Sequence, residues 1–224
     1  MPAPITVVIP TLNAAEALKR SLPPLVKGTT EGLIHAVIFA DGGSNDALAA
    51  IAEESGVEII SSSPGRGTQL KLACEAVLSD WILVLHSDTI LPQDWTDHVK
   101  QALSVPDRAH VFRLTFDAKG FWPSLVASWA NWRTRWLNLP YGDQALLIHR
   151  RLYKKVGGYS DIPLMEDVAI AKALGQKINL MAATVTTSAS RYTQDGWLKR
   201  GGKNIGLLVR YKLGADPKTL ARRY

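Results

Sequence analysis

The sequence predicts an α/β domain whose mostly parallel sheet is flanked by helices. Short apolar runs rich in β-formers alternate with helical segments over the first hundred residues. Strands that alternate with helices are joined by right-handed crossovers, which make neighbouring strands parallel. The 224 residues, 46% hydrophobic and 21% charged, suffice for one globular domain with a substantial core.

The first half contains four predicted strands with a helix after each of the first three. Apolar β-rich residues define the strands, and helix formers with apolar spacing define the helices. Asp41 to Asp46 is a turn that leads into the second helix. The predicted strands cover residues 5–9, 33–40, 57–60 and 81–85, and the helices cover 14–26, 47–54 and 68–78.

The second half begins with a strand over residues 111–116 and then departs from this pattern. Residues 121–139 hold four of the seven tryptophans, spaced by seven, three and four residues on one helical face: Trp122, Trp129, Trp132 and Trp136. Further strands are predicted at 141–148 and 178–187, and further helices at 150–158 and 165–174. The tail from Asp195 is basic and Gly-rich, with no predicted element. Without a repeat or linker, residues 1–224 form one predicted domain.

Charge and cysteine content narrow the classes of partner. The excess of 26 Lys and Arg over 20 Asp and Glu gives a charge of +6, which favours a nucleotide, a phospholipid surface or a nucleic acid. Cys74 is the only cysteine, which excludes an intrachain disulfide and a cysteine-built zinc site. The start at Met1 lacks the pattern of a signal peptide, so a cytoplasmic protein is expected, with membrane-surface contact left open.

Polar clusters directly follow all four strands of the first half. Successive carboxyl ends of a doubly wound sheet lie along one edge, so clusters that are distant in the sequence are expected to meet there. This convergence predicts a ligand site. The clusters are residues 10–13, 41–46, 64–69 and 86–88.

Each cluster also has a purely structural interpretation. Asp41 is suited to accept hydrogen bonds from a ribose or a base, but the motif alone favours a simple turn with a helix cap. Arg66 lies between two glycines. It is either a flexible cation that binds a nucleotide or part of a solvated loop. The Gly-Lys-Ser/Thr of a Walker loop is missing there.

His86 and Asp88 are candidate metal ligands. Mg²⁺ and Mn²⁺ use one or two carboxylates together with phosphate oxygens and water, so Asp88 alone suffices once a diphosphate is bound. His86 shares the face of Asp88 if the chain stays extended. The alternatives are a strand-end cap for Asp88 and a structural role for His86.

Acidic residues recur in the second half. Glu166 and Asp167 begin a predicted helix, where the helix dipole favours them, but one of them is also suited to accept a proton from an attacking hydroxyl. Asp143 and Gln144 form another polar pair ahead of an apolar run.

The ordered motifs resemble family 2 glycosyltransferases. They are VVIPTLNA (7–14), ADGGSNDAL (40–48), GRGTQLKLA (65–73), LHSDTILP (85–92), YGDQALLIHRRLYKKVGGY (141–159) and PLMEDVAIAKAL (163–174). The likeness extends over residues 4–192 and is greatest to the small branch often labelled radical-SAM/selenodomain-associated transferases. It implies a Rossmann-like GT-A fold, a nucleotide-sugar donor, a divalent metal (Mg²⁺ or Mn²⁺) and inversion at the anomeric carbon.

The resemblance assigns roles to individual residues. Residues 1–110 form the donor half, and residues 111–224 form the acceptor half. Asp88 is implied as the metal ligand, with His86 in place of the usual first aspartate, and Asp167 is implied as the base beside Glu166. Of Ser190-Arg191-Tyr192, only Arg191 fits the basic residues of many relatives. The expected nucleotide-sugar contacts are Pro10, Thr11, Asn13, Asp41, Arg66, Gln69, Ser87, Asp88, Asp143, Gln144 and Arg191.

The Trp-rich segment is predicted on the acceptor side. Tryptophan faces stack on sugars or lie at lipid headgroups, and Arg133 and Arg135 are suited to phosphates. Packing on the sheet or a homodimer contact explains the stripe equally well. The predicted acceptor is a hydroxyl or phosphate group, on a glycan or a lipid-linked molecule.

Two other functions are open at this stage. A nucleotidyltransferase that makes nucleotide sugars shares such a sheet, but its Gly-rich basic loop would stand where residues 10–13 read Pro-Thr-Leu-Asn. A non-catalytic basic adaptor for membrane or nucleic acid explains the charge but not the ordered acidic clusters. We therefore expect an enzyme with no nucleic-acid partner.

Overall fold

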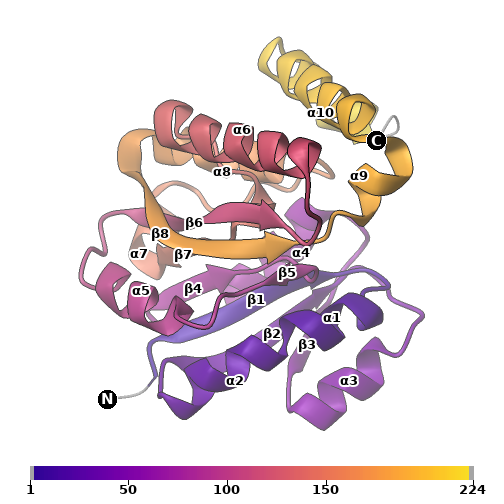
Figure 1. The fold of residues 1–224 in the computed structure, drawn as a ribbon. Helices are drawn as coiled ribbons and strands as arrows, with labels where there is room; N and C mark the ends of the chain where they lie inside the picture. The colour runs from indigo at the N-terminus through magenta and orange to yellow at the C-terminus, as the bar shows by residue number, and fades with distance from the viewer. Residues whose placement is uncertain (1–2, 222–224) are drawn as a thin grey trace.

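The computed structural model describes residues 3–221 as one eight-stranded sheet with helices on both faces (Figure 1). The strands are β1 (Ile5–Thr11), β2 (Ile34–Asp41), β3 (Glu58–Ser61), β4 (Trp81–Val84), β5 (Thr89–Ile90), β6 (Ala109–Phe116), β7 (Leu146–His149) and β8 (Ile178–Thr187). The helices are α1 (Ala15–Ser21), α2 (Pro23–Thr30), α3 (Leu48–Ser55), α4 (Arg66–Ala76), α5 (Trp95–Ala102), α6 (Phe121–Leu137), α7 (Arg150–Lys155), α8 (Glu166–Leu174), α9 (Ser190–Asp195), α10 (Trp197–Lys212) and α11 (Pro217–Ala221), with 3₁₀ turns η1 (Gly142–Gln144) and η2 (Gly175–Lys177).

The sheet has the order β3-β2-β1-β4-β7-β6-β8-β5. The first four strands are parallel, as are β6 and β8, whereas β7 runs antiparallel to both neighbours and β5 runs antiparallel to β8. The predicted α/β class with a mostly parallel sheet is confirmed. Because β1, β2 and β4 point the same way, the polar clusters that follow them lie at one edge.

Alternation along the strands divides the core between the two faces of the sheet. In β1, Ile5, Val7 and Ile9 pack on one face with α1, α2, α5 and α6, while Val8 packs on the other face with α4, α7 and α8. Successive side chains of a strand point to opposite faces, so an apolar run buried on both sides is what such a central strand requires.

Several regions differ from the sequence prediction. β5, α5 and α9 lie where no element was predicted, and the strand predicted over residues 141–148 is η1 followed by β7. The single helix predicted over residues 14–26 is two helices, α1 and α2, divided at Leu22. Pro23 cannot donate to the preceding turn and sits instead at the first position of α2, where proline is tolerated. The tail from Asp195 was predicted without an element but contains α10 and α11. The glycines lower the helix propensity of this segment, so the sequence pattern does not predict a helix. Tertiary packing stabilises the helices instead.

The described residues contain no helix that is both long and apolar enough to cross a bilayer.

Gly67 holds α4 against the loop before α8. A Cβ atom at this position would lie 2.3 Å from the Ile162 carbonyl oxygen and 2.4 Å from that of Ser160. Backbone atoms cannot yield as a flexible side chain can, so we expect Gly67→Ala to lower the free energy of unfolding by about 1–3 kcal/mol or more. Urea unfolding measures this.

The matched control is Gly206→Ala in α10, where a Cβ atom meets nothing within 4 Å. This substitution should leave stability unchanged or raise it by up to about 1 kcal/mol, because alanine favours helix. Equal midpoints for the two variants would show that α4 does not depend on this close approach.

Candidate active site

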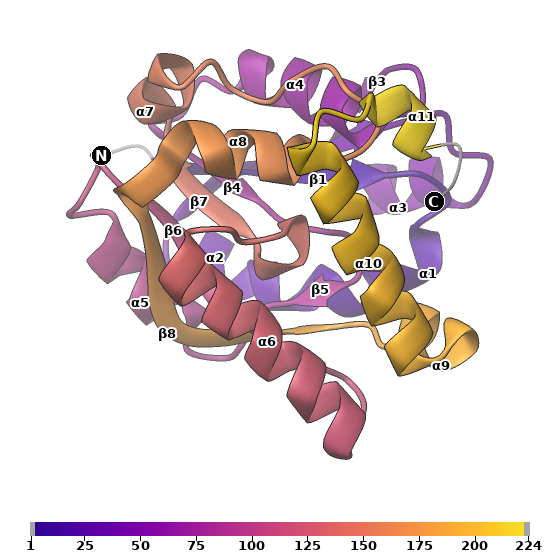
Figure 2. The same cartoon turned by 90° about the horizontal axis from the view of Figure 1, so that it is seen from above.

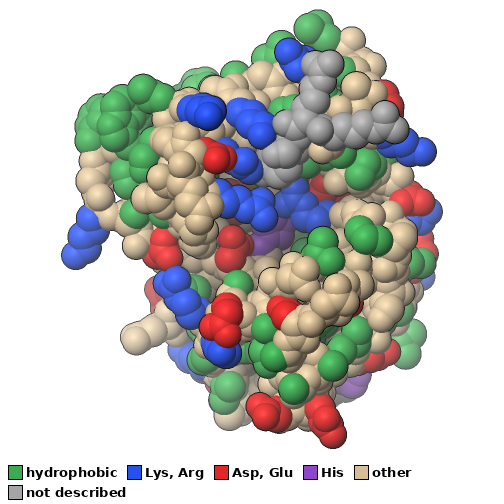
Figure 3. All heavy atoms as spheres, turned by 90° about the vertical axis from the view of Figure 1, so that its right-hand side faces the viewer, with side chains coloured by type: hydrophobic (Ala, Val, Ile, Leu, Met, Phe, Trp, Pro, Cys, Tyr) green, Lys and Arg blue, Asp and Glu red, His purple; other side chains and the backbone are tan. Residues whose placement is uncertain are grey.

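Two adjoining cavities lie beyond the carboxyl ends of β1 and β4. We call the first, lined by Pro10, Thr11, Gln69 and Ser87 among others, the β1 cavity. The second, lined by Tyr141, Asp143, Asp167 and Tyr192 among others, is the central cavity. Figure 3 looks onto this side of the molecule, where Lys and Arg side chains gather around a hollow with a histidine visible beneath them. The residues lining both cavities are Arg66, His86, Asp88, Leu164 and Arg191.

The loops after β1 and β2 are tied together by side chains. Asn13, with φ of 51°, accepts a 2.8 Å hydrogen bond from the Asn45 amide, and its own amide donates to Ser44. The Asp41 carboxylate accepts from Thr11, from the Gly43 and Ser44 amides and from the Ser44 hydroxyl. Burial alone would raise the pKa of Asp41, but these hydrogen bonds hold it below its usual value. Neither Asn13 nor Asp41 lines the two cavities.

Gln69 braces the same edge from α4. Its side chain is buried, and its amide nitrogen donates 2.7 Å hydrogen bonds to the carbonyls of Thr11 and Ala40, at the ends of β1 and β2. Two of the predicted nucleotide loops are therefore fixed through one side chain. Gln69 also contributes to the lining of the β1 cavity.

His86, Ser87 and Asp88 turn away from the strand after Leu85. The amide of Thr89 donates to the His86 carbonyl at 3.0 Å, so the chain is not extended here, yet His86 and Asp88 still line the same cavities. The His86 ring lies against Gly142, where a Cβ atom would be 2.3 Å from Nε2. Burial, with the nearby cations Arg66 and Arg191, lowers the pKa of His86 to about 3. The imidazole is therefore neutral at physiological pH.

Asp88, the predicted metal ligand, lines both cavities. Burial raises the pKa of its carboxyl group, and Arg191 and Arg66 partly oppose this. Among residues 3–221, no three His, Cys, Asp or Glu side chains form a group able to hold a metal by themselves. A single carboxylate fits Mg²⁺ or Mn²⁺ when diphosphate oxygens and water complete the shell. Asp143 also lines the central cavity, and its Oδ1 atom is buried without a hydrogen-bond partner in the described structure.

The acidic pair at the start of α8 is divided between two roles. Glu166 is buried behind the cavity and forms an ion pair with Arg66, Nε to Oε1 at 3.1 Å. Burial raises the pKa of Glu166 to about 7 despite the arginine. Asp167 lines the central cavity, and its carboxylate accepts from the Gly142 amide at 3.0 Å and the Val168 amide at 2.7 Å. Asp167 can therefore reach a ligand, whereas Glu166 positions Arg66.

The backbone is strained beside both acidic segments. Met165, directly before Glu166, has φ of 70°, and Ala145, two residues after Asp143, has φ of 50°. Non-glycine residues in this region cost about 1–3 kcal/mol each, and such strain persists where the surrounding structure fixes it. Both residues are buried, which holds the two segments in place around the cavity.

Asp143 and Gln144 point in different directions. Gln144 is fully buried away from the cavities, accepting from Thr134 and donating to the Phe112 carbonyl. The Asp143 carboxyl group lines the central cavity, and burial, with Asp167 and Asp88 nearby, raises its pKa to about 6. The structure thus brings Asp143 to the site and leaves Gln144 in the core.

The pKa of Asp143 predicts a pH dependence of stability. Its ordinary value is 3.8, so the unfolded chain loses this proton at lower pH than the folded chain. The contribution of Asp143 to stability is full below about pH 4 and is lost as the pH rises towards 6. Asp143→Asn should remove this component, so that its melting temperature changes less between pH 4 and 6 than that of the wild type. If the melting temperatures of the wild type and the variant change equally between pH 4 and 6, the pKa of Asp143 is not raised.

Several lining residues were not predicted. Tyr141 lines the central cavity, and the Arg133 guanidinium lies 3.4 Å from its ring centroid. Arg200 and Asn204 reach the central cavity from α10. Tyr141 and Gly142 directly precede Asp143, and this proximity to a predicted site residue could have indicated that they line the cavity. No sequence signal pointed to the α10 residues, because that helix was not predicted.

Comparison with known proteins places the chain in a family. The family model described as Glycosyl transferase family 2 matches residues 6–155. The match spans more than half of the chain, so the protein belongs to this family, and its sheet and helices are those of the GT-A fold. No curated protein sequence gives a match.

Solved structures agree in fold. The mannosyltransferase PcManGT from Pyrobaculum calidifontis, in complex with GDP-Man and Mn²⁺, has a TM-score of 0.68 at 14% identity over 96% of this chain and 66% of that one. Mannosyl-3-phosphoglycerate synthase from Rubrobacter xylanophilus has a TM-score of 0.64 at 18% identity, with coverages of 94% and 74%. S. aureus TarS 1-349 in complex with UDP-GlcNAc has a TM-score of 0.63 at 15% identity over 82% of this chain. The chain spans 58% of that TarS chain.

Proposed function

We propose that the protein is an inverting, metal-dependent glycosyltransferase that moves a sugar from a nucleotide-sugar donor to an acceptor hydroxyl or phosphate. The observation that carries this proposal is the convergence of Asp88, Asp167 and Arg191 on one cavity at the carboxyl ends of β1 and β4. A metal-ligand candidate, a base candidate and a cation are thereby within one space, although the sequence separates them by up to about a hundred residues. The family supports the same chemistry.

The nucleotide is expected in the β1 cavity. Pro10, Thr11 and Gln69 line this cavity. Asp41 and Asn13 line neither cavity, so their predicted contact with the base or ribose would be made outside both. Arg66 and Arg191 line both cavities and are suited to the diphosphate. The donor sugar would then lie towards the central cavity, near Asp143.

Asp88 would hold the metal together with the donor, and His86 borders the same space. The metal, when bound, supplies positive charge that stabilises the leaving diphosphate. The chain adds Arg66 and Arg191, whose charges act on the same group. PcManGT and M. tuberculosis glucosyl-3-phosphoglycerate synthase have structures in complex with Mn²⁺, which supports a divalent metal here.

Asp167 is proposed as the general base. Two backbone amides hold its carboxylate, and the residue lines the central cavity. We expect it to meet the acceptor hydroxyl there, on the side of the sugar opposite the diphosphate. Proton removal by Asp167 lets the acceptor oxygen form the new bond to C1 while the bond from C1 to the diphosphate breaks. Glu166 acts indirectly, through Arg66.

A thermal-shift panel of UDP-, GDP- and dTDP-sugars, each with and without Mn²⁺, tests donor binding. Ligands of the native state raise stability by mass action, so one nucleotide should raise the melting temperature in the presence of metal. Stabilisation by NTP with release of pyrophosphate would instead favour the nucleotidyltransferase. Binding to membranes or nucleic acid that is lost at high salt and unaffected by nucleotides would favour a basic adaptor.

A further inference from the structure

The His86 side chain packs against the backbone of η1. A Cβ atom at Gly142, the first residue of η1, would lie 2.3 Å from His86 Nε2, 2.7 Å from Cε1 and 3.3 Å from Cδ2. The tip of the imidazole therefore fills the space that a side chain at Gly142 would need. The φ of Gly142 lies outside the left-handed region, so this close approach, and not the backbone conformation, requires a glycine here.

The same glycine holds the proposed base. The Gly142 amide donates a 3.0 Å hydrogen bond to Asp167 Oδ2, and the Val168 amide donates to Oδ1 at 2.7 Å. Val168 belongs to the same helix as Asp167, so only the bond from Gly142 ties the carboxylate to another element. α8 packs on β4 and β7 (Figure 2), and η1 leads into β7. The orientation of Asp167 therefore depends on the position of η1.

η1 is fixed both from the core and from the segment that follows β4. Gln144, which is fully buried, donates to a backbone carbonyl of β6 at 3.0 Å. Thr89, also fully buried, donates a long hydrogen bond of 3.5 Å to the Asp143 carbonyl. His86 adds a contact from the same segment as Thr89. Removal of the imidazole would leave η1 held at Gln144 and Asp143, with empty space beside Gly142.

We propose that His86 is a positioning residue for the base, whose ring holds Gly142 in place so that the Gly142 amide orients Asp167. This inference rests on the proposed function, in which Asp167 takes the acceptor proton, and it gives His86 a role other than metal ligation. A reacting group that is misplaced by about 1 Å can cost about 10²-fold in rate. The segment after β4 would thus set the metal position through Asp88 and the base position through His86.

Two substitutions distinguish the tip of the ring from the rest of it. Glutamine is long enough to reach the place of Nε2, whereas asparagine lacks the two atoms nearest Gly142, which are Nε2 and Cε1. Hydrogen exchange of the Gly142 amide, followed by NMR in ¹⁵N-labelled protein, reports on its bond to Asp167. We expect exchange about tenfold faster in His86→Asn and within about threefold of the wild type in His86→Gln. Circular dichroism checks that each variant is folded.

Kinetics with a nucleotide sugar, Mn²⁺ and a panel of hydroxyl acceptors give the second readout. His86→Asn should lower kcat by about 10-fold to 10²-fold, and His86→Gln should restore most of it. Donor affinity in the presence of Mn²⁺, measured by calorimetry, should stay within about twofold of the wild type in both variants. A residue that only stabilised the fold would not separate kcat from donor affinity in this way.

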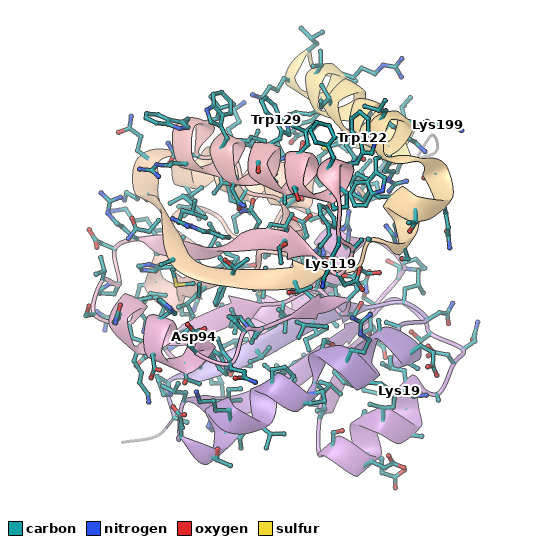
Figure 4. All side chains as sticks on the ribbon, in the orientation of Figure 1. Lys19, Asp94, Lys119, Trp122, Trp129 and Lys199 are labelled. Carbon is teal, nitrogen blue, oxygen red and sulfur yellow. The ribbon has the colours of Figure 1, made fainter. Side chains whose placement is uncertain are left out.

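His98→Asn is the matched control, because His98 on α5 lies 3.4 Å from Asp94 and lines neither cavity. Figure 4 shows Asp94 beside α5, across the molecule from Lys199 on α10. The same substitution at His98 should change neither the exchange of the Gly142 amide nor kcat.

Unchanged exchange of the Gly142 amide in His86→Asn would overturn the proposal, because the ring would then not support this amide. Donor affinity that falls in both His86 variants while Gly142 stays protected would also overturn it, since His86 would then contact the metal or the donor. If no nucleotide sugar binds or reacts, the proposed function fails, whereas the exchange measurement still decides whether His86 holds Gly142.

Gly142→Ala tests the same contact without any change at His86. The added Cβ atom would collide with the ring, so we expect a lower kcat with donor affinity unchanged. A kcat equal to that of the wild type would overturn the proposal, because the fit between the ring and Gly142 would then not matter to the base.

Discussion

Asp167→Asn is expected to lower kcat by about 10²–10⁴-fold, the usual contribution of a general base. The amide keeps the size of the side chain but cannot take a proton from the acceptor. Donor affinity should stay within about twofold, because Asp167 lies in the central cavity and not in the β1 cavity. Steady-state kinetics, with calorimetric titration of the donor, separates the two effects.

Asp97→Asn is the matched control, since it also lies in the first turn of a helix, α5, but is exposed and remote from the cavities. It corrects for the loss of a favourable charge at a helix N-terminus, worth about 0.3–1 kcal/mol. Donor affinity that falls as steeply as turnover in Asp167→Asn would remove this residue from the role of base.

Asp88→Asn is expected to abolish the effect of metal on donor binding. Asp88 is the only proposed carboxylate ligand, so an amide should leave the diphosphate without a stable metal partner. In calorimetry, Mn²⁺ should tighten donor binding by the wild type by at least tenfold and change that of the variant little. Turnover with saturating donor should fall as well, because positive charge at the leaving group is reduced.

Asp80→Asn supplies the control, because Asp80 is exposed at the opposite end of β4. Retention of the full metal effect in Asp88→Asn would place the metal elsewhere, and His86 with Asp143 would then be the residues to examine. The same loss in both variants would indicate a general disturbance of β4.

The sheet and its polar edge could be predicted because they depend on local patterns. Apolar runs gave the strands of the parallel half within one or two residues, and parallel direction then required their ends to meet. Thr11, Arg66 and Asp88 indeed line one cavity. Whether a side chain in such a cluster faces a ligand or the core depends on packing. That is why Gln144 and Glu166, predicted beside Asp143 and Asp167, lie away from the cavity.

The second half of the chain could be predicted only in part. Helical spacing predicted a helix over residues 121–139, and α6 confirms it, but whether its tryptophans pack on the sheet was left open, and the structure exposes them. α10 was not predicted because three glycines lower its helix propensity. It nevertheless contributes Arg200 and Asn204 to the lining of the central cavity. The cavity lined by residues of α6 and α10 is a product of tertiary packing, and no single segment of the sequence encodes it.

The products formed from a nucleotide sugar test the central claim most directly. The protein is incubated with Mn²⁺, the nucleotide sugar that stabilises it and a panel of hydroxyl acceptors, and phosphorus NMR follows the nucleotide. The account predicts release of nucleoside diphosphate in step with glycoside formation, absent in Asp167→Asn. Formation of pyrophosphate from NTP and sugar phosphate, with no diphosphate released from the nucleotide sugar, would contradict it.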